Sequence, residues 1–142
     1  MNYKYIFHFH MLVNFLLLFM TFQADLTPDQ LEKIRSQSKI CISKTGVDKE
    51  KVKRMKDGIF ADDDKLQEFL LCLMKHFGVF KADGNINVDL LASKLSSNLS
   101  QNERDDIVNN CFSIRADTDK ETVFLLYKCY REKVGDKRIE FV

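Results

Sequence analysis

The sequence predicts an all-α protein, and three observations lead to this prediction. Turn and loop residues recur at short intervals, and the segments between them repeat apolar side chains at helical spacing. No segment of useful length alternates apolar and polar residues as a half-buried strand would. The middle of the stretch 119–134, DKETVFLLYKCYREKV, is apolar on every side except at Lys128. A helix that is apolar on all sides must be surrounded by its own protein or by lipid. Because this run is too short to span a bilayer, we expect a central helix packed among other helices.

Residues 1–24 have the order of a secretory signal peptide. Lys4 is followed by an apolar stretch at 11–20 and by a small residue, Ala24, before the expected cut. Phe22 is bulkier than the side chain usually found three positions before the cut. The alternative is a membrane anchor, but the interrupted apolar run is marginal for spanning a bilayer. We therefore expect a secreted protein with one mature domain, 25–142.

The mature domain is small and electrically balanced. Removing 24 of the 142 residues leaves 118, which is enough for one modest core. The full chain has 22 basic and 21 acidic residues, and Lys4 is the only charge that the cut removes, so 21 of each sign remain. This balance argues against nucleic acid or an anionic membrane as the main partner, and we expect no membrane insertion.

The first helix has clear signals at both of its ends. Thr27, Pro28 and Gln30 form a capping-box pattern with proline at the first helical position. Gly46 follows the last residue of the apolar face. We therefore expect this helix over 28–45.

Two further helices are expected before the middle of the chain. A short, highly charged helix over 48–57 carries lysines that form a solvated face. The acidic triplet at 62–64 could suggest a metal site. However, it directly precedes a helix, where carboxylates cap free N–H groups, so we favour capping. The third helix is expected over 64–77, and its apolar stripe consists of Leu66, Phe69, Leu70, Leu73, Met74 and Phe77.

The segment 83–87 imitates the start of a calcium-binding loop. Its Asp and Asn residues match the first three ligand positions. Val88 and Lys94 then stand where glycine and a bidentate glutamate are needed, so we interpret the segment as an ordinary Asp-Gly turn. A fourth helix is expected over 88–97.

Asn98-Leu99-Ser100 is a sequon for N-glycosylation, and it falls in an expected loop. Ser100 can also act as a helix cap, because Glu103 three residues later completes a capping box. Asn98 is therefore a candidate glycosylation site, and Ser100 begins the fifth helix. That helix carries Ile107, Val108, Cys111 and Phe112.

Catalytic constellations are missing from the mature domain. His76 is its single histidine, which excludes most pairs of nucleophile and base. The sequence has no glycine-rich phosphate loop and no HExxH motif. Cys72 and His76 have a possible zinc-ligand spacing, but two more ligands are missing and an oxidising compartment favours a disulfide. We therefore expect no enzyme, no metal site and no cofactor.

The cysteines carry the most information about the class of protein. An even number in a small secreted chain implies disulfides, and four cysteines allow three pairings. The four are Cys41, Cys72, Cys111 and Cys129. In a signal-bearing chain of six helices, this pattern resembles the insect odorant-binding proteins, the pheromone-binding and general odorant-binding family.

The register of the cysteines places the resemblance within one subgroup. Six-cysteine members of the family have three residues between the second and third cysteines and eight between the fifth and sixth. If Cys72 is the third cysteine and Cys129 the sixth, the missing second and fifth fall on Glu68 and Lys120. The family joins its second and fifth cysteines in one disulfide, so both missing cysteines belong to the same bridge. The pattern is that of the four-cysteine, or minus-C, subgroup.

The resemblance implies a compact bundle of about six helices around an internal apolar cavity, with disulfides Cys41–Cys72 and Cys111–Cys129. The insect chemosensory proteins are a second four-cysteine carrier family, but they have two tightly spaced cysteine pairs, which this chain lacks. If the register holds, Glu68 and Lys120 lie within reach of each other. We expect an ion pair there in place of the missing bridge.

The implied function is a secreted carrier for small apolar ligands such as odorants, pheromones or other semiochemicals. A chemosensory receptor is a further expected partner, and the carrier is expected to be a monomer or a weak homodimer. Phe141 is expected at the mouth of the cavity, and Tyr127 or Tyr130 is expected to hydrogen-bond the ligand. Helical spacing and the resemblance select these lining residues: Phe69, Met74, Phe77, Ile86, Leu91, Leu95, Val108, Val123, Tyr127, Tyr130 and Phe141.

Two alternatives remain open at this point. Each selected residue could serve simple core packing instead of lining a cavity. The whole chain could also be a secreted interaction module, with a solid core and helices that present a patch to a protein partner.

Overall fold

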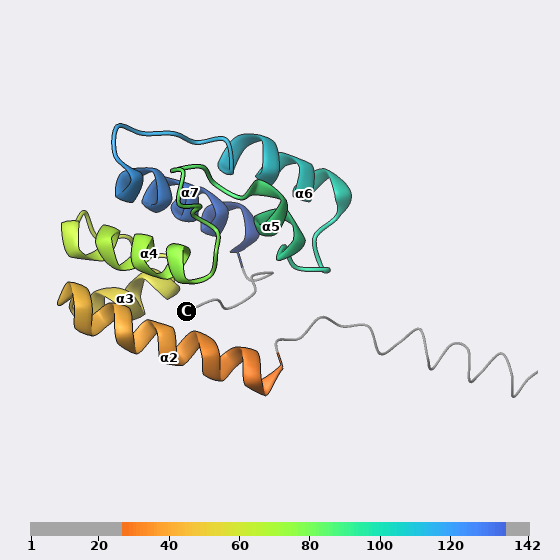
Figure 1. Cartoon of the computed structure of the whole chain (residues 1–142). Coiled ribbons are helices and arrows are strands. Elements are labelled where there is room, and N and C mark those ends of the chain that lie inside the picture. The colour runs from red at the N-terminus through yellow and green to blue at the C-terminus, as the bar shows by residue number, and fades with distance from the viewer. Residues whose placement is uncertain (1–26, 136–142) are drawn as a thin grey trace, which may run out of the picture.

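The structure is a computed structural model, and it describes residues 27–135 (Figure 1). The expected signal peptide and Phe141 lie outside this range. The described chain forms six α-helices and one π-helical turn, and none of these helices is long and apolar enough to cross a bilayer. They are α2 (Pro28–Thr45), α3 (Lys49–Lys56), α4 (Asp64–His76), α5 (Val88–Ser93), α6 (Gln101–Asp106), η1 (Ile107–Cys111) and α7 (Asp119–Val134). The predicted all-α class is confirmed.

Local capping sets the ends of α2 as the sequence predicted. Thr27 Oγ1 accepts a hydrogen bond from the Gln30 N–H at 3.2 Å, and the Thr27 N–H donates to Gln30 Oε1 at 2.9 Å. Gly46 closes the helix with φ of 66°, a left-handed conformation that favours glycine, and its N–H donates to the carbonyl of Ile42.

The acidic triplet also caps a helix, as predicted. Asp63 is the N-cap of α4, and its Oδ1 accepts from the Leu66 N–H at 2.9 Å. The other carboxylate oxygen, Oδ2, accepts a hydrogen bond from Lys51 of α3. These interactions, led by that of Lys51, lower the pKa of Asp63. In the turn after α4, Asp83 Oδ1 accepts from the Asn85 N–H at 2.9 Å, which is ordinary Asp-Gly turn geometry.

One predicted helix bound was wrong, and the fifth helix contains a π turn that the sequence did not predict. The helix predicted over 88–97 ends at Ser93, because Arg104 takes up the next carbonyls. Arg104 Nη1 donates to the oxygens of Leu95 at 3.2 Å and of Ser96 at 2.9 Å. The fifth helix changes from α6 into the π turn η1, where the Phe112 N–H donates to the carbonyl of Ile107 at 3.1 Å.

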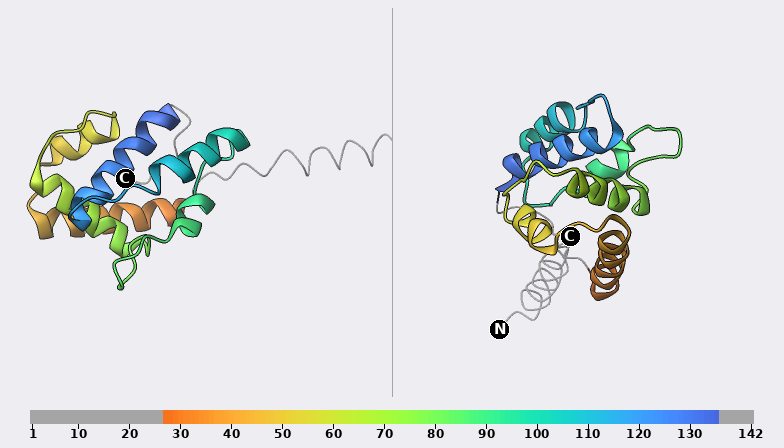
Figure 2. Two further views of the ribbon diagram at one scale, coloured as in Figure 1. Left: turned by 90° about the horizontal axis from the view of Figure 1, so that it is seen from above. Right: turned by 90° about the vertical axis from the view of Figure 1, so that its left-hand side faces the viewer.

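The helices form layers around α7. In Figure 1 and in the right-hand view of Figure 2, α2 lies on one side, α4 comes next, and α6 and α7 lie beyond α4. The most extensive helix contacts are those of α4 with α7 and of α2 with α4. Side chains on several sides of α7 are buried, as expected of a central helix. The buried ones are Thr122, Val123, Phe124, Leu126, Tyr127, Tyr130, Arg131 and Val134.

Two disulfides fasten these layers. Cys41–Cys72 joins α2 to α4 with the two Cα atoms 5.8 Å apart. Cys111–Cys129 joins η1 to α7 with the two Cα atoms 5.5 Å apart. This pairing is the one that the resemblance implied.

Arg131 fastens the ends of two helices. Its side chain is buried, and Nη2 donates to the carbonyl of Lys56 at 2.6 Å while Nη1 donates to that of Gly135 at 3.1 Å. These oxygens lie at the C-terminal ends of α3 and α7, where carbonyl groups lack helical partners and the dipole favours a cation. Arg131 therefore holds α3 against the end of the central helix.

Candidate ligand pocket

One pocket lies among α2, α4, α5 and α7 and has a volume of about 340 Å³. A volume of this size falls in the usual range for small-molecule sites. Its lining residues are Gln30, Lys33, Ile34, Leu70, Leu73, Met74, His76, Phe77, Val79, Leu90, Leu91, Lys94 and Tyr127.

The lining is graded from an apolar floor to a polar rim. Ile34, Leu70, Leu73 and Val79 are buried, and the other aliphatic and aromatic lining residues of α4 and α5 are half-buried. The exposed members of the lining are all polar or basic: Gln30, Lys33, His76 and Lys94. A ligand with an apolar body and one polar end would match this gradient.

Each helix contributes to the pocket through a different part of its surface. The N-terminal half of α2 supplies Gln30, Lys33 and Ile34, and the C-terminal half of α4 supplies four residues, to which its C-cap Phe77 adds a fifth. Tyr127 comes from the central helix, and its ring packs edge-on against Phe60 with the ring centroids 5.9 Å apart. This ring contact holds the Tyr127 side chain in place.

Four of the predicted lining residues line this pocket: Met74, Phe77, Leu91 and Tyr127. Another five are buried elsewhere in the core and do not line it: Phe69, Ile86, Leu95, Val123 and Tyr130. Val108 is half-buried against the core, and Phe141 lies outside the described residues. Phe69 and Val123 are 0% and 1% exposed, which fits the alternative that these residues serve core packing instead of lining a cavity. A ligand-binding role remains a prediction for all eleven.

Sequence reasoning missed the contribution of α2. Ile34 lies within the helix expected over 28–45, but it was not assigned to a cavity. Leu70 and Leu73 were likewise placed on the stripe of α4 without a role. A signal was available for Ile34, because the implied Cys41–Cys72 bridge brings the apolar face of α2 onto α4.

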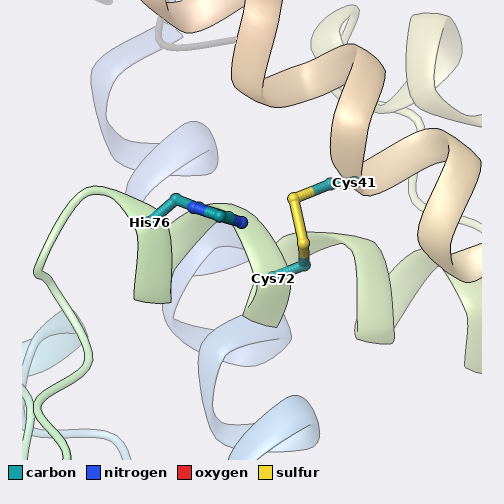
Figure 3. Close-up of side chains that lie close together, drawn as sticks. All are labelled: Cys41, Cys72 and His76. Carbon is teal, nitrogen blue, oxygen red and sulfur yellow. A yellow bond between two sulfur atoms is a disulfide. The ribbon is translucent and has the colours of Figure 1, made fainter.

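His76 lies beside the Cys41–Cys72 disulfide, as Figure 3 shows, and it is an exposed member of the pocket lining. A ring nitrogen of His76 and the sulfur atoms of Cys41 and Cys72 lie within 4.8 Å of one another. The two sulfurs are joined to each other. They are therefore not the thiolates that a zinc site requires.

Lys120 contacts two carboxylates of α4. Its Nζ donates a hydrogen bond to Asp64, and it lies 3.8 Å from Glu68 Oε1. Asp64 and then Glu68 raise the pKa of Lys120 by favouring its charged form. The expected contact with Glu68 is present, but Asp64, which the sequence reasoning did not consider, is the closer partner. All three side chains are partly or largely exposed, so the group contributes little stability.

The sequon lies in the loop between α5 and α6. Asn98 is exposed in a turn, and Ser100 is the N-cap of α6. Ser100 Oγ accepts from the Glu103 N–H at 3.3 Å, and the Ser100 N–H donates to Glu103 Oε2 at 2.7 Å. The predicted capping box is present, and glycosylation of Asn98 remains a prediction.

Solved structures of insect proteins have this fold. Odorant binding protein 5 of Apis mellifera matches with a TM-score of 0.66 and 26% identity, covering 83% of this chain and 99% of its own. The odorant binding protein lmigOBP1 of Locusta migratoria matches with a TM-score of 0.65 and 24% identity, covering 79% of this chain and 87% of its own.

Sequence comparison gives the same result. The B1 protein of Tenebrio molitor is 33% identical over 115 residues, which cover 80% of this chain and 87% of the relative. The sequence profile of the PBP/GOBP family matches residues 23–133. The chain therefore belongs to the PBP/GOBP family.

Proposed function

We propose that the protein is a secreted carrier that binds and solubilises small hydrophobic ligands, such as odorants, pheromones or other semiochemicals. The observation that carries this proposal is the pocket of about 340 Å³ with its buried apolar floor. Membership of the PBP/GOBP family supports it. The family and fold are those of carriers, not of enzymes.

Binding by this pocket would rest on desolvation. Each Å² of apolar ligand surface that leaves water contributes roughly 25 cal/mol. Tyr127 is the proposed polar contact at the apolar end, because a tyrosine ring joins an apolar body to a hydroxyl group.

Leu91→Trp is expected to weaken the binding of a neutral fluorescent probe, such as N-phenyl-1-naphthylamine, at least about tenfold. Leu91 is half-buried and lines the pocket, so an indole there fills space that the ligand needs. Titration of the oxidised mature domain measures the effect. Leu125→Trp is the matched control, because Leu125 is exposed on α7 and does not line the pocket.

The rival function is an interaction module with a solid core. The exposed large apolar side chains of the described chain are Ile40, Ile59 and Leu125, which lie on α2, on the α3–α4 link and on α7. Because each of the three comes from a different element, they favour a monomeric or weakly dimeric carrier over a module that docks through one apolar helix face. Failure of the wild-type protein to take up any probe would overturn the carrier proposal in favour of that module.

Secretion is the second part of the proposal. Protein expressed from the full chain in insect cells is expected in the medium, with Asp25 as its first residue and a glycan on Asn98. Intact-mass spectrometry before and after deglycosylation checks both points, and Asn98→Gln should remove the mass difference. Retention of residues 1–24 in the cell membrane would instead identify an anchor.

We also assign the chain to the minus-C subgroup as a proposal. Lys120 Nζ lies 3.8 Å from Glu68 Oε1, so the two positions where cysteines would be missing face each other across α4 and α7. A chemosensory receptor as a partner remains a proposal as well, because it follows from the kind of ligand carried.

A further inference from the structure

The lysine and histidine side chains that line the pocket are all basic. Lys33, His76 and Lys94 line it from α2, from α4 and from the end of α5, and no lining residue of the described chain is acidic. The mature domain as a whole contains equal numbers of acidic and basic residues. This local excess of basic groups is therefore not a consequence of overall composition.

The basic side chains have no partners among the described residues. None of the three takes part in an ion pair or a side-chain hydrogen bond within that part of the chain, and all three are exposed. Other lysines of this protein do pair, including Lys51 with Asp63 and Lys133 with Asp106. The pocket rim thus presents cations whose charge is not neutralised by these residues.

Helix dipoles explain part of this arrangement but not Lys33. His76 is the last residue of α4 and Lys94 is the C-cap of α5, positions at which a cation is stabilised by the helix dipole. Lys33 lies near the N-terminal end of α2, where the dipole offers a cation no stabilisation. An interaction with something bound in the pocket would account for a lysine there.

We propose that the ligand is an amphipathic carboxylate, with its head at the rim beside Lys33 and Lys94 and its hydrocarbon chain on the apolar floor. This inference rests on the proposed carrier function and specifies its ligand class. A carboxylate accepts charge-assisted hydrogen bonds from ammonium groups, and the His76 imidazole can donate a further one. Because the rim is exposed, each contact is screened, and two lysines together should favour the anion over a neutral ligand about tenfold.

Calorimetry with nonanoate and 1-nonanol tests the ligand class, because the two share one hydrocarbon chain and differ in the head group. The wild-type mature domain is expected to bind nonanoate about tenfold more tightly at about 20 mM NaCl, and the ratio should fall severalfold at about 0.5 M. In Lys33→Gln/Lys94→Gln the preference should disappear, because affinity for nonanoate should fall much more than affinity for 1-nonanol. Lys39→Gln/Lys128→Gln removes two exposed lysines outside the pocket and should keep the preference.

The outcomes separate this inference from the carrier function. Equal affinity of the wild type for both compounds would overturn the carboxylate assignment and leave the carrier intact. A preference that survives in Lys33→Gln/Lys94→Gln would overturn the placement of the head group beside these two lysines. If neither compound binds, the carrier proposal fails and the assignment fails with it. Retained binding of 1-nonanol by the variant shows that its pocket is folded.

Discussion

Cys41→Ala/Cys72→Ala is expected to lose about 3 to 4 kcal/mol of unfolding free energy. The bridge closes a loop with a sequence separation of 31, and chain entropy gives a stabilisation of about this size for such a loop. Urea denaturation of the oxidised protein, with the other bridge intact, measures the loss. Because α2 supplies Ile34 and Lys33 to the pocket, ligand affinity should fall as well.

Cys111→Ala/Cys129→Ala is the matched comparison, since its loop has a separation of 18 and should stabilise slightly less, about 3 kcal/mol. This bridge joins η1 to α7 and does not line the pocket, so ligand affinity measured on the folded fraction should change less. A loss of less than about 1 kcal/mol for the Cys41–Cys72 bridge would show that contacts of α2 with α4 suffice without it.

Glu68→Cys/Lys120→Cys is expected to form a third disulfide and to raise the melting temperature by about 10 °C. The two positions are 52 residues apart in the chain, and closing such a loop should stabilise by about 3 to 4 kcal/mol. The substitution removes little stabilisation free energy, because the ion pair of Lys120 with Glu68 is exposed. Scanning calorimetry of the oxidised variant, with mass spectrometry for the bridge, measures the gain.

Glu68→Ser/Lys120→Ser provides the control, since it removes the same charges and forms no bridge. Its melting temperature should lie close to that of the wild type. If the two cysteines stay reduced under conditions that oxidise the other four, positions 68 and 120 do not occupy the place of a missing bridge. The minus-C assignment would then be withdrawn.

The helices that the sequence located well are those whose ends are set by nearby residues. Thr27 with Gln30, Asp63 with Leu66, and Ser100 with Glu103 are contacts between residues three positions apart, so the printed sequence contains both partners. The end of α5 depends instead on Arg104, which lies eight and nine positions beyond the carbonyls that it binds. Local patterns do not show a contact of that kind.

The pocket lining was harder to predict because one helix stripe serves two purposes. Phe69 and Met74 both belong to the apolar stripe of α4, yet Phe69 is fully buried in the core and Met74 lines the pocket. The difference depends on which neighbouring helix covers each part of the stripe. Sequence periodicity identifies the stripe but contains no information about where packing is left incomplete.

The two walls of the pocket are attached to the protein in different ways. One wall, made by α2 and α4, is fixed covalently by Cys41–Cys72. A second wall is α5, a helix of six residues with no buried side chain of its own and no cysteine. Substitutions at Leu90, Leu91 and Lys94 can therefore reshape the pocket at little cost to the core. Ligand preference can thus diverge among relatives through this short helix while the disulfide-linked framework stays constant.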